Sequence, residues 1–121
     1  MKNILIVDDD DDIRVFINAL LKDEGYKITE ASNGKECLKI LGKKNFDLIL
    51  LDFFMPEMSG REVAEKIREN PKTKNAKFAF LTVAEFGEEG MAVIKKLKCL
   101  DYIKKPIDNK DFIRRVKRMT A

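Results

Sequence analysis

The sequence predicts an α/β domain in which helices cover both faces of a parallel β-sheet. Short apolar runs typical of strands alternate five times with longer stretches in which apolar residues recur at helical spacing. The run Leu48–Leu51 is apolar without interruption, as expected of a central strand that is buried on both faces. This strict alternation favours a doubly wound sheet of five parallel strands joined by right-handed crossovers.

Five segments are predicted to be strands because each is a short apolar run next to polar or turn-forming residues. In chain order they are Ile4–Val7, Tyr26–Ala31, Leu48–Leu51, Phe78–Val83 and Tyr102–Ile103. The first run ends abruptly in a series of aspartates that begins at Asp8. Asp10, Asp11 and Asp12 of that series are interpreted as capping and first-turn residues of the following helix.

Five amphipathic helices are expected between and after these strands. In the first, apolar residues recur at i, i+3, i+4, i+7 and i+8, and we expect all of them to face the core: Ile13, Phe16, Ile17, Leu20 and Leu21. The inward residues predicted for the other four helices are Cys37, Leu38 and Leu41; Val63, Ala64 and Ile67; Met91, Ile94 and Leu97; and Phe112, Ile113, Val116 and Met119. Gly25 and Gly42 are placed as helix stops.

Length and composition set limits on organisation and partners. The chain has 121 residues, and we expect residues 1–121 to form one domain without an output module. The net charge of +3 is too small to predict nucleic-acid binding. No run approaches the roughly 18 apolar residues of a membrane span, and the two cysteines make no disulfide framework. We therefore expect a cytoplasmic protein that binds neither membrane nor nucleic acid directly.

The chain contains no histidine, which excludes several chemistries. A Ser-His-Asp triad, a Cys-His nucleophile pair and a His-ligated metal all require that side chain. The chain likewise cannot carry a phosphohistidine. Acid–base or nucleophilic chemistry must therefore use Asp, Glu, Lys, Tyr or Cys.

Polar residues capable of chemistry stand at the ends of four predicted strands. Asp8-Asp9, Asp52, Thr82 and Lys104-Lys105 occupy these positions. In a doubly wound sheet the ligand site lies beyond the carboxyl ends of the strands, so these residues are predicted to converge. Clustered carboxylates repel one another unless a cation compensates, and either a lysine or Mg²⁺ would do so.

Several stretches together resemble the receiver domain of two-component response regulators. They are Ile4-Leu5-Ile6-Val7-Asp8-Asp9, Asp47-Leu48-Ile49-Leu50-Leu51-Asp52, Met55-Pro56-Glu57-Met58-Ser59-Gly60, Phe80-Leu81-Thr82 and Asp101-Tyr102-Ile103-Lys104-Lys105-Pro106. The resemblance covers essentially the whole chain, and in its length the chain is similar to the stand-alone chemotaxis regulator. It implies a flavodoxin-like (βα)5 fold with strand order 2-1-3-4-5.

The resemblance also implies a site that accepts a phosphoryl group. Asp52 would be the phosphoacceptor, and Asp8, Asp9, Asp52 and the backbone carbonyl of Phe54 would bind Mg²⁺. Thr82 would hydrogen-bond the phosphoryl group. Lys105, chosen over Lys104 because it precedes Pro106, would pair with it across a cis Lys105–Pro106 bond.

The implied partners are proteins. A sensor histidine kinase or a phosphotransfer protein would donate the phosphoryl group. Thr82 and Tyr102 would act as the switch that reports phosphorylation to the face formed by the fourth helix, the fifth strand and the last helix, where a downstream protein binds. The protein is then no enzyme beyond catalysing its own phosphorylation and dephosphorylation, and it is expected to be a monomer or a weak dimer.

Two other interpretations remain open. A haloacid-dehalogenase-type phosphatase also uses an Asp nucleophile, but it needs a second acid where this chain has Phe54. A degenerate receiver that binds proteins without phosphorylation is the main alternative, because Val83 stands where a small residue is usual. If Asp52 is phosphorylated, Phe54 is expected to hinder attacking water and to prolong the phosphorylated state.

Overall fold

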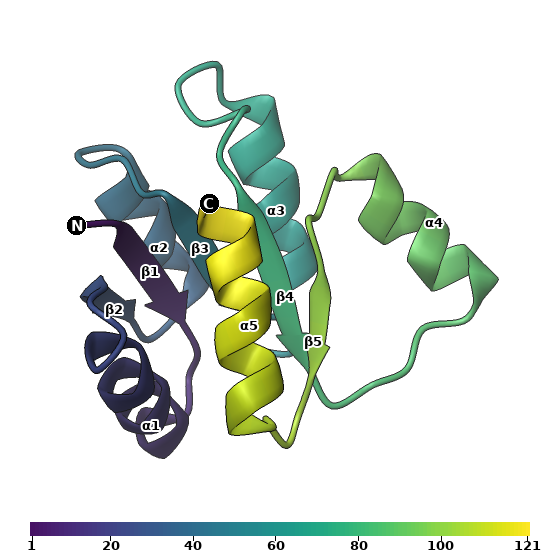
Figure 1. The fold of residues 1–121 in the computed structure, drawn as a ribbon. Coiled ribbons are helices and arrows are strands. Elements are labelled where there is room, and N and C mark those ends of the chain that lie inside the picture. Colours follow the sequence, from purple (N-terminus) through teal and green to yellow (C-terminus); the bar gives the residue numbers. More distant parts are fainter.

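The computed structural model describes residues 1–121 and shows a parallel sheet with helices on both faces (Figure 1). In chain order the elements are β1 (Asn3–Val7), α1 (Asp11–Lys22), β2 (Lys27–Ala31), α2 (Gly34–Leu41), β3 (Leu48–Asp52), α3 (Gly60–Glu69), β4 (Phe78–Thr82), α4 (Glu88–Lys96), β5 (Tyr102–Lys104) and α5 (Asn109–Thr120). The strands lie in the order β2-β1-β3-β4-β5, and every pair is parallel. The predicted fold and strand order are confirmed.

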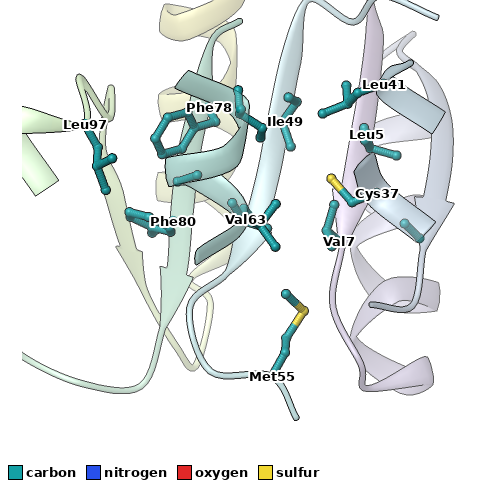
Figure 2. Close-up of a cluster of buried hydrophobic side chains, with 14 of the residues drawn as sticks. Leu5, Val7, Cys37, Leu41, Ile49, Met55, Val63, Phe78, Phe80 and Leu97 are labelled. Atoms are coloured by element: carbon teal, nitrogen blue, oxygen red, sulfur yellow. The ribbon is translucent and has the colours of Figure 1, made fainter. Parts of the chain in front are cut away.

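The sheet separates two apolar cores because successive side chains of each strand point to opposite faces. Leu5 and Val7 of β1 belong to one core, which residues of α2, α3 and α4 complete, whereas Ile4 and Ile6 belong to a second core with residues of α1 and α5. Figure 2 shows the first of these cores, in which Cys37 from α2 and Val63 from α3 meet the strand side chains. Burial on both faces explains why β3 and β4 are apolar along almost their whole length.

Helix starts are fixed by local hydrogen bonds that the sequence encodes. Asp10 is the N-cap of α1, and its carboxylate accepts hydrogen bonds from the amides of Asp12 and Ile13, which confirms the capping role predicted for it. A reciprocal capping box between Ser59 and Glu62 begins α3. These caps set where α1 and α3 start beside the ends of β1 and β3.

Gly60, the first residue of α3, lies against the backbone at the end of β3. Its amide donates a hydrogen bond to the carbonyl of Phe53 at 2.8 Å. A Cβ atom at this position would stand 2.2 Å from the carbonyl oxygen of Asp52. Only glycine fits this close approach, so the loop between β3 and α3 folds back tightly onto the end of the strand.

Three predictions about individual residues are wrong. Phe16 was expected to face the core but is 44% exposed, because it borders a shallow hollow near the loop after β5 instead of packing beneath the sheet. Met91 is also exposed, since the first turn of α4 stands at the margin of the sheet (Figure 1). The predicted strand Phe78–Val83 is one residue too long, because β4 ends at Thr82 and Val83 beyond it is 68% exposed.

None of the helices is long and apolar enough to traverse a bilayer.

Candidate functional site

The predicted site residues gather at the carboxyl ends of the strands. Asp8 directly follows β1, Asp52 ends β3, Thr82 ends β4, and Lys105 directly follows β5. Parallel pairing brings these ends to one edge of the sheet, although the residues are separated by up to 97 positions in the chain. Because the strands are buried, the backbone positions from which these side chains extend are fixed.

Lys105 joins the two buried carboxylates. Its Nζ donates hydrogen bonds to Oδ2 of Asp8 at 2.8 Å and to Oδ1 of Asp52 at 3.3 Å. Its backbone amide donates to the carbonyl of Thr82 at 2.8 Å, and the Lys105–Pro106 bond is cis, as predicted. Lys104 points to solvent and pairs with Glu85, so the choice of Lys105 as the inward lysine is correct.

Three carboxylates form a compact oxygen cluster. Asp8, Asp9 and Asp52 can each offer a carboxylate oxygen, and these atoms lie within 4.8 Å of one another. Asp8 is fully buried and Asp52 is 5% exposed, while Asp9 is open to solvent. A set of hard oxygen donors with one exposed side suits Mg²⁺, which prefers a few carboxylates and keeps several waters.

The protein environment raises the pKa of Asp52 to about 7. Burial is the largest cause and the negative charge of Asp8 is the second, whereas Lys105 acts in the opposite direction. Burial also disfavours the charged form of Lys105, but the hydrogen bond that Lys105 donates to Asp8 and the charge of Asp52 outweigh it and raise the pKa of Lys105. A further cation is therefore favourable here, because it would keep Asp52 ionised at neutral pH.

Phe54 follows the site residues in the loop after β3. Its carbonyl oxygen accepts no hydrogen bond from the backbone, so it is free to act as a ligand. Its ring is 52% exposed and packs edge-to-face on Phe53, with 5.0 Å between the ring centroids. Phe54 therefore places an apolar side chain, and not a carboxylate, at the sequence position where a second acid of a phosphatase would stand.

Thr82 and Tyr102 make no hydrogen bond to the carboxylates of the cluster. Thr82 is fully buried at the end of β4, and its hydroxyl accepts a hydrogen bond from the amide of Ala84. Tyr102 lies one strand farther out, half-buried on β5. The Lys105 ammonium group therefore contacts the carboxylates, whereas Thr82 is linked to Lys105 only through the backbone.

A chain of aromatic rings connects the loop after β3 to Tyr102. Phe86, in the loop before α4, packs edge-to-face on Phe53 at 4.9 Å and on Tyr102 at 5.9 Å between ring centroids. Gly90 makes room for this ring, because a Cβ there would stand 2.9 Å from Cβ of Phe86. Sequence reasoning missed Phe86, since one aromatic residue in a polar loop gives no periodic signal.

Arg14 is a second residue that sequence reasoning missed. Its guanidinium lies under the loop that carries Asp8 and Asp9, and it donates a hydrogen bond to the backbone carbonyl of Asp8. Its side chain is only 13% exposed. The sequence does contain an indication of this role: Arg14 is a charged residue three positions before the buried Ile17, which places it on the inner side of α1.

Replacing Asp52 by Asn should stabilise the protein at pH 8 without Mg²⁺. The variant loses one of two buried like charges and keeps the pair between Lys105 and Asp8, so the free energy of unfolding should rise by roughly 1–3 kcal/mol. The raised pKa of Asp52 means that folded wild type binds a proton more tightly than unfolded chain, so wild-type stability increases as the pH falls from 7 towards 4. The gain should therefore shrink over that range.

Urea unfolding of both proteins at pH 8 and pH 4 measures this difference. Asp23→Asn, which removes an exposed carboxylate after α1, is the control and should show no comparable pH-dependent gain. An Asp52→Asn protein no more stable than wild type at pH 8 would contradict the electrostatic account of the site.

The sequence matches the model of the response regulator receiver domain over residues 4–117. It is 39% identical over 115 residues to the transcriptional regulatory protein SrrA of Staphylococcus aureus; the match covers 94% of this chain and 46% of SrrA. It is also 38% identical over 114 residues to an uncharacterised 14.6 kDa protein of Leptolyngbya boryana, covering 94% of this chain and 86% of that protein. The chain thus spans about half the length of SrrA and most of the second relative.

Solved structures show the same relationship. The chemotaxis protein CheY4 of Vibrio cholerae superposes with a TM-score of 0.90 at 29% identity, covering 98% of both chains. The response regulator TrrA of Thermotoga maritima, in complex with Mg²⁺-BeF, has a TM-score of 0.84 at 37% identity and covers 98% of this chain and 99% of its own. With this fold, this acidic cluster and these relatives, the chain belongs to the response regulator receiver domains of two-component systems.

Proposed function

We propose that this receiver domain accepts a phosphoryl group on Asp52 with the help of Mg²⁺ and thereby switches a protein-binding face. The observation that carries the proposal is the position of Lys105 Nζ, within hydrogen-bond distance of both Asp8 and Asp52 beside the oxygen cluster. An ammonium group and several carboxylates are what a transferred phosphoryl group needs at its acceptor. A histidine kinase or a phosphotransfer protein is the proposed donor.

Asp8, Asp9, Asp52 and the Phe54 carbonyl are the proposed Mg²⁺ ligands. TrrA was crystallised with Mg²⁺-BeF, and the donor set of this chain suits the same ion. When bound, Mg²⁺ supplies positive charge that offsets the negative charge of the acceptor site and of the incoming phosphoryl group.

Phosphoryl transfer to Asp52 then requires only that the chain position the acceptor carboxylate and supply positive charge next to it. A carboxylate oxygen of Asp52 attacks phosphorus, the P–N bond of the donor phosphohistidine breaks, and its electron pair stays on the imidazole. Lys105 holds positive charge beside the phosphoryl oxygens as they gain negative charge. No general base is needed because the nucleophile is an ionised carboxylate, which agrees with a chain that lacks histidine.

The proposed response runs through Thr82 and Tyr102. The new phosphoryl oxygens attract the Thr82 hydroxyl. Before phosphorylation this hydroxyl accepts a hydrogen bond from the Ala84 amide. Movement of Thr82 changes the space next to Tyr102, whose ring packs on Phe86. A change at Tyr102 would alter the face of α4, β5 and α5, where we propose that the downstream protein binds.

The first test is incubation with Mg²⁺ and acetyl phosphate followed by intact mass measurement. Wild type should gain the mass of one phosphoryl group, because Asp52 is the acceptor. Asp52→Asn should gain none, and Asp9→Asn should react more slowly because it loses one proposed metal ligand. Equal modification of the Asp52→Asn protein would move the nucleophile to another residue.

Phe54 is proposed to prolong the phosphorylated state. Its half-exposed ring follows Asp52 by two positions in the loop after β3, and we propose that it hinders a water molecule that would attack phosphorus. Phe54→Asn should lose the phosphoryl mass severalfold faster than wild type, because it opens this space and offers hydrogen bonds to water. Phe54→Leu keeps apolar bulk and should remain slow; an Asn variant no faster than wild type would refute the role.

A receiver that binds partners without phosphorylation is the second candidate, because Val83 places a branched apolar side chain in the hollow that Lys105 also lines. The chain has no Trp and two Tyr, so a Tyr26→Phe variant reports fluorescence from Tyr102 alone. Beryllofluoride with Mg²⁺, a stand-in for the phosphoryl group, should make Tyr102 less accessible to acrylamide quenching. The change should vanish when Asp52→Asn is added. Bound beryllofluoride without any change at Tyr102 would favour the passive binder.

A further inference from the structure

Arg14 connects three segments that meet beneath the acidic cluster. Its Nε donates to Oε1 of Glu30 on β2 at 3.1 Å, and its terminal nitrogens contact the carboxylate of Asp11 and the carbonyl of Asp8. Burial disfavours the charged form of Arg14, but the hydrogen bonds that Arg14 donates to Asp11 and Glu30 outweigh it and raise the pKa of Arg14. A buried, fully paired guanidinium of this kind has one fixed orientation.

Asn18 and Glu30 hold the guanidinium in place from the far side. The side-chain amide of Asn18 donates to Oε2 of Glu30 at 2.7 Å, so both oxygens of this carboxylate have a partner from α1. Glu30 is itself fixed in the sheet, where it lies opposite Ile6 in the register of β1 and β2. Arg14 is therefore anchored on the Glu30 carboxylate, which the hydrogen bonds from Arg14 and Asn18 hold in one orientation.

The Asp8 carbonyl is where this anchored group acts on the site. That oxygen accepts no backbone hydrogen bond, so Arg14 is its only donor within the chain. The carbonyl belongs to the peptide unit that joins Asp8 to Asp9. Fixing this unit fixes the direction in which the solvent-exposed Asp9 carboxylate leaves the backbone.

We propose that Arg14 is a positioning residue for Mg²⁺: it clamps the Asp8–Asp9 peptide so that both carboxylates point at one ion. The inference rests on the metal site of the proposed function and adds a residue to it that touches neither the ion nor the phosphoryl group. Residues that orient metal ligands commonly change affinity for the ion by tenfold or more when they are removed.

The charge of Arg14 and its positioning role predict opposite changes in Mg²⁺ affinity when Arg14 is replaced, which makes the inference testable. Arg14 is a cation near a site for a divalent cation, so its charge alone weakens Mg²⁺ binding. If charge were its whole effect, Arg14→Met would bind Mg²⁺ more tightly than wild type. If Arg14 positions the ligands, the same variant binds Mg²⁺ more weakly despite losing the repulsive charge.

Calorimetric Mg²⁺ titration of wild type, Arg14→Met and Arg14→Lys decides between these outcomes. We expect about tenfold weaker binding for Arg14→Met. Arg14→Lys keeps the charge but cannot contact Asp8, Asp11 and Glu30 at once, so it should also bind more weakly than wild type. Lys104→Met removes an exposed cation from the same end of the sheet and should bind equally or slightly more tightly.

Circular dichroism and urea unfolding show whether each variant is folded, and Arg14→Lys serves if Arg14→Met is not. Binding by the Arg14 variants as tight as wild type, or tighter, overturns the inference while leaving the proposed function intact. Wild type that binds no Mg²⁺, or binds it equally after Asp52→Asn, overturns the proposed function and this inference together.

Discussion

Two buried carboxylates and one ammonium group form the interaction on which the site depends. Asp8 and Asp52 are withdrawn from water at adjacent strand ends, and Lys105 is the single cation that reaches both. Burial and, second to it, the negative charge of Asp8 raise the pKa of Asp52 to about 7, because one ammonium group does not compensate two buried carboxylates. This uncompensated negative charge lowers folding stability and makes an additional cation electrostatically favourable at the site.

The rest of the fold keeps the two carboxylates close together. Strands β1 and β3 are buried on both faces, so the carboxylates at their ends cannot move towards water without breaking the apolar core. Gly60 lets α3 begin directly against the backbone of Asp52, and the caps of α1 and α3 fix the two loops next to the cluster. The fold thus holds together two carboxylates whose like charges would otherwise drive them apart.

The aromatic rings give the site a physical connection to a distant surface. Phe53 directly follows Asp52, and Phe86 lies between Phe53 and Tyr102 in edge-to-face contacts. Packed rings transmit displacement because interiors have little free volume. This arrangement couples the loop after β3, the loop before α4 and the strand β5 as one packed unit, without any polar contact between Tyr102 and the carboxylates.

Sequence alone determined the fold class, the strand-end positions of Asp8, Asp52, Thr82 and Lys105, and the choice of Lys105 over Lys104, because alternating patterns and motif spacing are local properties. Only the tertiary structure decided that Phe16 faces solvent, since helical periodicity does not say how far the partner surface extends. It likewise revealed Arg14 and Phe86, whose contacts join segments far apart in the chain. The raised pKa of Asp52 also follows from burial and from the nearness of Asp8, and no pattern along a chain encodes either quantity.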